Sequence, residues 1–317
     1  MSAYQGADIM DFEGSAQTKI LNVKDVINVI AGPLPQIDID YDAETGVLWI
    51  DLRPEPKPVF TLNLIESVRK VQGVIERTLL PQDLAPRFLA YRSSGPFFSM
   101  GGDIDFYLDC LATGDRAALS EYAHLAAEVV ANNMSGLGGR VVTLATVGGK
   151  ALGGGIDPAR ACHVMIAEEG ASFCYPEINY NHFPITATSV LCRRVSPLVA
   201  QEVLTSGETY DARAFAGLNL VDEVVPAGSG EAWITDYARR NAPRQRALAG
   251  LFAALARETG DWRRSLAAGA DAWVDHMLAL RPVEISRLQR IAHAQERILA
   301  RAAPGAPSWP RAAVAAE

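Results

Sequence analysis

The sequence lacks the features of a membrane-spanning, disulfide-linked or nucleic-acid-binding protein. Its 317 residues contain no apolar run near the roughly 20 residues that cross a bilayer, and the N-terminus lacks the basic and apolar regions of a secretory signal. The four cysteines lie far apart without a C-x-x-C pair, which argues against a disulfide framework or a zinc site. The net charge of −8 and pI of about 5.3 argue against a nucleic-acid surface. We therefore expect a cytoplasmic protein that binds neither nucleic acid nor a membrane.

What the sequence does contain is a large apolar fraction, 49%, arranged in strands and helices. Residues 1–35 show no sustained periodicity and are interpreted as an N-terminal extension. Residues 36–229 alternate strands such as "RFLAYRSS", "RVVTLATV" and "HVMIA" with helices, which predicts an α/β core. Around "ETG" the alternation predicts a hairpin, and apolar spacing predicts a helix over 64–79 that starts near Asn63. Residues 230–303 predict a helical section, with helices starting near Glu231, Gln245, Trp262 and Val283; residues 304–317 form a Pro/Ala-rich tail.

The stretch "ALGGGIDPARACH" (151–163) is unusual because three glycines interrupt an apolar region. It fits no phosphate-binding motif: Lys150 is followed by Ala151, and Pro158 stands where the third glycine of G-x-G-x-x-G belongs. The chain also has no G-x-S-x-G and no H-E-x-x-H. The sequence therefore does not support nucleotide cradling, a serine nucleophile elbow or a zincin site, and we predict no metal.

Glycines between a strand and a helix offer backbone N–H groups with no partner inside the helix. Such groups stabilise a developing oxyanion by roughly 3–4 kcal/mol per donor. A second donor would have to come from another strand end, and "FFSMGGD" (97–103) is the candidate.

Three stretches together resemble the crotonase (enoyl-CoA hydratase/isomerase) superfamily. They are "FFSMGGDIDFY", "ALGGGIDPARACHVMIAEEGASFCYPE" and "SGETYDARAFAGLNLVDEVVP". Within that superfamily "GLGGRVVTLATVGGKALGGG", "CHVMIAEEG" and "DAWVDHMLALRPVEISRLQRIAHAQERI" are most similar to diffusible signal factor synthases, which make cis-2-unsaturated fatty-acid signals. The resemblance implies a crotonase-type spiral of β-β-α units with a C-terminal helical section that covers a neighbouring subunit in a homotrimer or hexamer.

The resemblance also implies a substrate and a set of site residues. The substrate would be an acyl thioester of coenzyme A or of an acyl carrier protein, with coenzyme A or phosphopantetheine as the substrate's carrier and no separate cofactor. The oxyanion donors would be the amides of Gly154 and of Met100 or Gly101. The two catalytic carboxylates would be Asp157 and Glu177, dehydrating a 3-hydroxyacyl thioester and then hydrolysing it.

Asp157 departs from the family, which usually has glutamate at this position. Its carboxylate is drawn back by one methylene, about 1.5 Å, and Pro158 disfavours helical geometry for the residue before it. An aspartate followed by proline also suits a helix N-cap. Catalyst and cap therefore remain open alternatives for Asp157.

Further along, "FPITATS" places Ile185 and Ala187 where the family commonly has glycines. Polar residues at 175, 179, 180 and 182 suggest an altered substrate, although a structural role is the simpler interpretation for His182, as for His163. The basic residues at 239, 240, 244 and 246 could meet carrier phosphates or form a solvated helix end. Three hypotheses follow: a hydratase or dehydratase with thioesterase activity, a hydrolase for a more polar acyl group, and a catalytically silent binding protein.

Overall fold

The computed structural model describes residues 22–258 and 260–302. The predicted tail at 304–317 and residues 1–21 of the predicted extension lie outside this range. Among the described residues the strands form two sheets, with orders β1-β2-β3-β5-β7-β10 and β4-β6-β8-β9. The strands are β1 (Ile37–Asp42), β2 (Val47–Leu52), β3 (Phe88–Ser93), β4 (Phe97–Ser99), β5 (Val142–Val147), β6 (Lys150–Leu152), β7 (Val164–Glu168), β8 (Ser172–Cys174), β9 (Thr209–Asp211) and β10 (Glu223–Val225).

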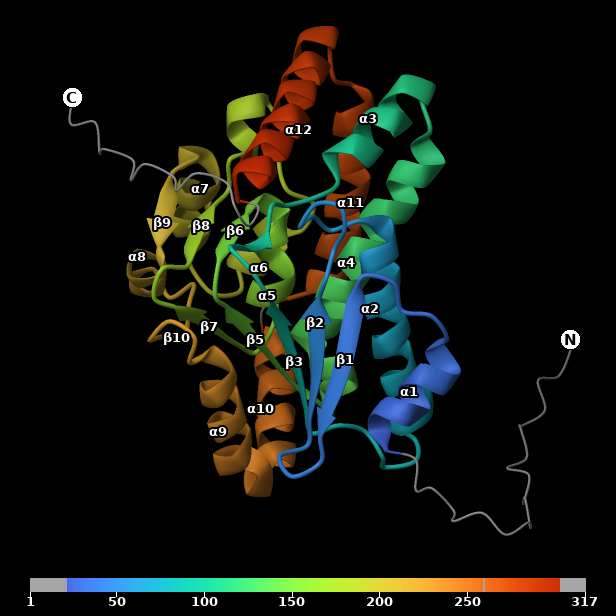
Figure 1. Cartoon of the computed structure of the whole chain (residues 1–317), viewed down its shortest axis with the longest axis vertical. Coiled ribbons are helices and arrows are strands. Elements are labelled where there is room, and N and C mark those ends of the chain that lie inside the picture. The colour runs from blue at the N-terminus through green and yellow to red at the C-terminus, as the bar shows by residue number, and fades with distance from the viewer. Residues whose placement is uncertain (1–21, 259, 303–317) are drawn as a thin grey trace, which may run out of the picture.

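Helices connect and cover these sheets. Figure 1 shows α3 and α12 together at one end of the molecule and α9 and α10 at the other. The helices are α1 (Val23–Ala31), α2 (Leu62–Val74), α3 (Ile104–Thr113), α4 (Arg116–Gly139), α5 (Asp157–Arg160), α6 (Ala187–Leu191), α7 (Pro197–Ser206), α8 (Ala212–Gly217), α9 (Gly230–Asn241), α10 (Gln245–Glu258), α11 (Trp262–Leu278) and α12 (Pro282–Ala302), with short turns η1 (Ile75–Leu79), η2 (Gly153–Gly155), η3 (Glu177–Tyr180) and η4 (Ala242–Arg244).

The chain winds as a spiral in which a strand of the first sheet is followed by a strand of the second and then by a helical segment. The series β3–β4–α3, β5–β6–η2–α5 and β7–β8–η3 repeats this unit, as expected for β-β-α turns. Within the first sheet β1 and β2 are antiparallel and the later pairs are parallel. The predicted crotonase-type fold is therefore confirmed.

The inner strands of the first sheet, β2, β3, β5 and β7, are buried on both faces. Along β3, alternate side chains point to opposite faces: Leu89 and Tyr91 join the core with α2 and α4, whereas Phe88 and Ala90 join the core with α9 and α10. Burial on both faces explains why the parallel strands read as continuous apolar runs. None of the described helices is long and apolar enough to span a membrane.

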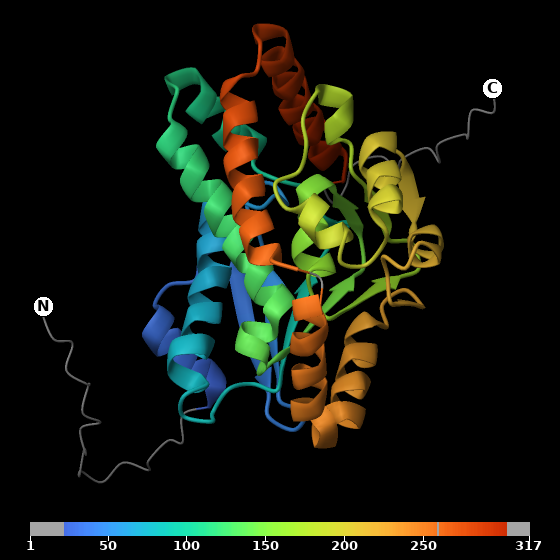
Figure 2. The ribbon, with the colours of Figure 1, turned by 180° about the vertical axis from the view of Figure 1, so that it is seen from behind.

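The structure differs from the sequence prediction at two helix starts. Helix α1 lies inside the predicted extension, where Asn22 and Asp25 form a capping box. Helix α2 begins two residues earlier than expected because Thr61, rather than Asn63, accepts a hydrogen bond from a backbone amide, that of Leu64. Among the C-terminal helices, α11 lies along α4 and α12 lies against α3 (Figure 2).

Candidate functional site

A cavity of about 580 Å³ opens where the glycine turn η2 meets the loop after β4. It is lined mainly by apolar side chains, and α12 closes one side of it with Leu288, Ile291 and Ile298. The side-chain amide of Gln295 on the same helix donates to the Met100 carbonyl oxygen at 3.3 Å. Helix α12 therefore forms part of the cavity wall.

The three glycines of η2 bring backbone close to a carboxylate. The Gly154 amide donates to Glu177 Oε1 at 2.8 Å. Gly153 has φ +55°, and a Cβ there would lie 2.2 Å from the same oxygen. Glycine is thus required by both the backbone conformation and the space. The segment that sequence reasoning singled out forms an amide donor at the cavity wall.

In the second loop the two amides predicted as donors are paired within the chain. The Met100 amide donates to the Pro58 carbonyl oxygen at 2.6 Å, and the Gly101 amide donates to Ser99 Oγ at 3.1 Å. Neither is therefore free for a ligand. The next amide, that of Gly102, has no hydrogen-bond partner among the described residues, and Gly102 lines the cavity.

The sequence does not show which amides of "FSMGGD" are paired within the chain, so it did not single out Gly102. A local signal was nevertheless present, since a second glycine follows Gly101 directly. The structure explains it: a Cβ at Gly102 would lie 1.9 Å from the Tyr107 hydroxyl oxygen. Only glycine therefore fits between the loop and α3.

Glu177 stands at the start of η3 and faces the cavity. Its Oε2 atom is shielded from solvent and has no hydrogen-bond partner among residues 22–258 and 260–302. Burial, which disfavours the charged form, raises the pKa of Glu177 to about 8. A carboxyl group of this kind can both accept and return a proton near neutral pH.

Asp157 is fully buried, with 0% of its surface exposed. Its two carboxylate oxygens accept hydrogen bonds from the Tyr175 hydroxyl and the Thr186 hydroxyl, each at 2.7 Å. Burial raises its pKa to about 7, and the two hydroxyl donors oppose that rise. Asp157 also lines the cavity, so the structure brings both predicted carboxylates to one site.

The N-cap interpretation of Asp157 is wrong. Helix α5 begins at Asp157 itself, and the helix has no side-chain cap. Its backbone is helical despite the following Pro158, which occupies the first turn where a missing N–H costs nothing. The reason is tertiary: Tyr175 and Thr186 hold the carboxylate away from the helix amides.

The polar residues near Glu177 have mixed roles. Asn179, Tyr180 and His182 line the cavity. His182 Nε2 accepts from the Trp273 indole N–H at 3.3 Å, and burial lowers the pKa of His182 to about 3. A neutral, indole-bound imidazole agrees with the structural interpretation. His163 is likewise buried, and its Nδ1 accepts from the Thr143 amide.

The predicted basic cluster does not reach the cavity. Arg239 pairs with Glu44, Arg240 with Asp236, and Arg246 with Asp83, while Arg244 donates to Asn241. These contacts correspond to the solvated helix end that was the alternative. No group of three or more His, Cys, Asp and Glu side chains in the described part of the chain is placed to hold a metal ion.

Comparisons with known proteins give a consistent family. The enoyl-CoA hydratase/isomerase family matches residues 80–260. A probable enoyl-CoA hydratase of Bacillus subtilis is 31% identical over 140 residues, which span 44% of this chain and 52% of that protein. The probable enoyl-CoA hydratase echA8 of Mycobacterium tuberculosis is 33% identical over 192 residues, 60% of this chain and 68% of that protein.

The fold is shared with solved structures. An enoyl-CoA hydratase/isomerase of Xanthobacter autotrophicus superposes with a TM-score of 0.69 at 20% identity, covering 87% of this chain and all (100%) of that one. At this identity the likeness concerns the fold alone.

Proposed function

Because the chain belongs to the enoyl-CoA hydratase/isomerase family, we propose that it moves protons at the α-carbon of a fatty-acyl thioester, as an enoyl-thioester hydratase or dehydratase. The observation that carries this proposal is the placement of Glu177 against the Gly154 amide, in an apolar cavity that also contains the unpaired Gly102 amide. An amide pair beside a carboxylate suits a carbonyl compound whose α-hydrogen is removed.

In the proposed dehydration the thioester oxygen displaces Glu177 from the Gly154 amide and accepts hydrogen bonds from Gly154 and Gly102. Glu177 then removes the α-proton, and the electron pair moves into an enolate whose oxygen the two amides stabilise. The β-hydroxyl leaves as water after it receives a proton, and the double bond forms between the α- and β-carbons. Hydration is the reverse sequence.

Asp157 is proposed to position the water or to supply its proton. Its pKa of about 7 leaves a substantial protonated fraction at neutral pH. When two carboxyl groups with raised pKa values lie near one site, one can act as the general acid and the other as the general base. The raised pKa of Glu177 results from burial first and from the charge of Asp157 only as the last contribution.

A second candidate, double-bond isomerisation, is favoured by one observation. Both oxygens of Asp157 are already hydrogen-bonded to hydroxyl groups and are closed to solvent. Glu177 alone would then remove a proton from the α-carbon and return it to the γ-carbon, moving the double bond by one position. That reaction needs no bound water and no second carboxyl group.

The resemblance to diffusible signal factor synthases supports a finer proposal, in which the dehydrated product is a cis-2-enoyl thioester that is then hydrolysed. In the hydrolysis, water adds to the thioester carbon, and the thiol leaves with a proton. The same two amides would hold the oxyanion of this step.

The experiment that tests the proposal is product analysis. The protein is mixed with 3-hydroxyacyl and 3-enoyl thioesters, on coenzyme A and on acyl carrier protein, and products are identified by mass spectrometry and NMR. A 2-enoyl thioester from the hydroxy substrate supports dehydration, and one from the 3-enoyl substrate supports isomerisation. Free acid that forms only after dehydration supports the finer proposal. Thioester binding without any product, identical in wild type and Glu177→Gln, would overturn the enzymatic assignment.

A further inference from the structure

One part of the cavity, here called the chamber, is an apolar space whose walls come mainly from elements other than the glycine turns. It is lined by side chains of α2, β2, β3 and α4. Protein interiors are normally packed with few voids larger than a water molecule, and an unfilled apolar void costs stability. A chamber of this composition therefore fits an apolar occupant.

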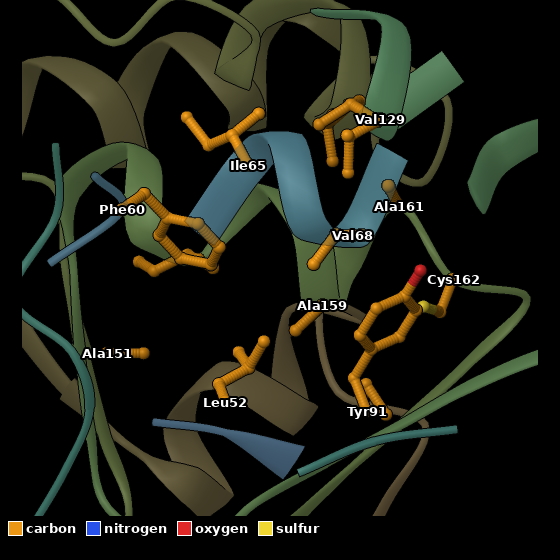
Figure 3. Packing of buried hydrophobic residues seen from close by; sticks show 14 of the residues in the cluster. Leu52, Phe60, Ile65, Val68, Tyr91, Val129, Ala151, Ala159, Ala161 and Cys162 are labelled. Carbon is orange, nitrogen blue, oxygen red and sulfur yellow. The ribbon is translucent and has the colours of Figure 1, made fainter. Parts of the chain in front are cut away.

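Figure 3 shows the arrangement of side chains around this space. Phe60 lies on one side and Tyr91 on the other, with Leu52, Val68 and Ala159 between them. All five line the cavity.

The Phe60 side of the chamber is the side of the proposed chemistry. The Phe60 amide donates to the Gly101 carbonyl oxygen at 2.8 Å, next to the free amide of Gly102. Tyr91 therefore stands at the end of the chamber that is farther from the proposed thioester position.

Tyr91 is held in place by a buried polar network. Its hydroxyl donates to Asn133 Oδ1 at 2.8 Å and accepts from Gln72 Nε2 at 3.2 Å. The Asn132 amide in turn donates to Gln72 Oε1 at 3.0 Å. Swinging the ring aside would leave buried polar groups without partners, which is costly. The phenol ring is thus a fixed wall.

We propose that the chamber takes an unbranched, saturated stretch of the substrate's acyl chain and that Tyr91 sets the longest chain accommodated. The proposal rests on the proposed function for the identity of the ligand as an acyl thioester. It assigns to Tyr91 a role in length selection that the carboxylates and glycines do not supply.

The test measures binding separately from turnover. Dissociation constants of saturated acyl-CoA thioesters, from butanoyl to hexadecanoyl, are measured by calorimetry. With wild type, affinity should rise by up to about fourfold for each added methylene buried and stop rising where the chain meets Tyr91. We call the chain length at which affinity stops rising the break. In Tyr91→Ala the break should move by about three or four carbons toward longer chains, because each C–C bond adds at most ~1.5 Å.

A second variant acts in the opposite direction. Val68→Phe adds bulk to the chamber and should move the break toward shorter chains; it carries the test alone if Tyr91→Ala does not fold. Tyr237→Ala is the matched control, because Tyr237 packs against Phe88 on the other face of the sheet. It should leave the break unchanged.

The outcomes separate the two proposals. A break at the same length in wild type, Tyr91→Ala and Val68→Phe, or no dependence of affinity on chain length, would overturn the role of Tyr91. Length-dependent binding that shifts as expected, without turnover of any thioester by wild type, would overturn the proposed function and leave the chamber assignment standing.

Discussion

The Glu177 carboxylate accepts a hydrogen bond from the Gly154 amide at 2.8 Å, and this amide is the one that the proposed mechanism gives to the substrate carbonyl. In the proposed mechanism, the Glu177 carboxylate therefore occupies one of the two amide donors before the substrate binds. A thioester must displace it, and the displaced carboxylate stays beside the α-carbon.

The position of Glu177 against the glycine turn predicts that alanine at Gly153 and alanine at Gly154 will lower the reaction rate by different amounts. In Gly153→Ala the new Cβ would meet Glu177 Oε1 at 2.2 Å in a strained backbone, whereas in Gly154→Ala it makes an ordinary 3.7 Å contact with Pro184. Because displacement of a reacting group by about 1 Å can cost roughly a hundredfold in rate, Gly153→Ala should lose about that much in kcat. Gly154→Ala, which keeps its amide, should lose far less. Equal losses in the two variants would argue against the contact.

The hydroxyl donors of Asp157 predict a shift in pH dependence. The Thr186 hydroxyl lowers the Asp157 pKa against the larger effect of burial. Thr186→Val keeps the shape but removes the donor, so the pKa should rise above about 7, and the limb of the pH–kcat profile that Asp157 sets should move to higher pH. The exposed Thr188→Val is the control. If the Thr186→Val profile coincides with wild type, Asp157 does not titrate during turnover.

Asp157 should also make stability depend on pH. Its folded pKa of about 7 exceeds the unfolded value of about 3.9. Between these values the folded chain holds a proton that the unfolded chain releases, so the free energy of unfolding falls as pH rises, by up to about 1.4 kcal/mol per pH unit. Above the pKa that Asp157 has in the folded state, this contribution to the free energy of unfolding no longer changes with pH.

This dependence can be measured by urea unfolding of wild type and Asp157→Asn across the same pH range. The variant lacks the titration, so its stability relative to wild type should increase from about pH 4 to about pH 7. A difference between the two proteins that stays constant over the range would contradict the raised pKa.

Much of the fold was predictable because its signals are local. The alternation in β1 and β2 and the continuous apolar runs of β3, β5 and β7 identify strands directly. The starts of α9 to α12 coincide with predicted helix starts to within a residue. Helix α1 was missed although Asn22 and Asp25 form a capping box, a short local pattern without a longer period.

The site was predictable only in part because its chemistry depends on distant contacts. The pairing of Met100 with Pro58 removes a predicted donor, and no feature near Met100 indicates it. The role of Asp157 is set by Tyr175 and Thr186, which lie 18 and 29 residues away. Local rules for Asp-Pro left a cap as one of two alternatives, and tertiary hydrogen bonds decide against it.

The most direct test of the central claim is deuterium incorporation at the α-carbon. A 2-enoyl or 3-hydroxyacyl thioester is incubated in heavy water with wild type or Glu177→Gln, and the α-position is followed by NMR. Wild type should introduce deuterium there, and Glu177→Gln should do so about a hundred to ten thousand times more slowly, because it lacks the acid–base group, while binding the thioester comparably. Incorporation at equal rates in both proteins would contradict Glu177 as the group that moves the α-proton.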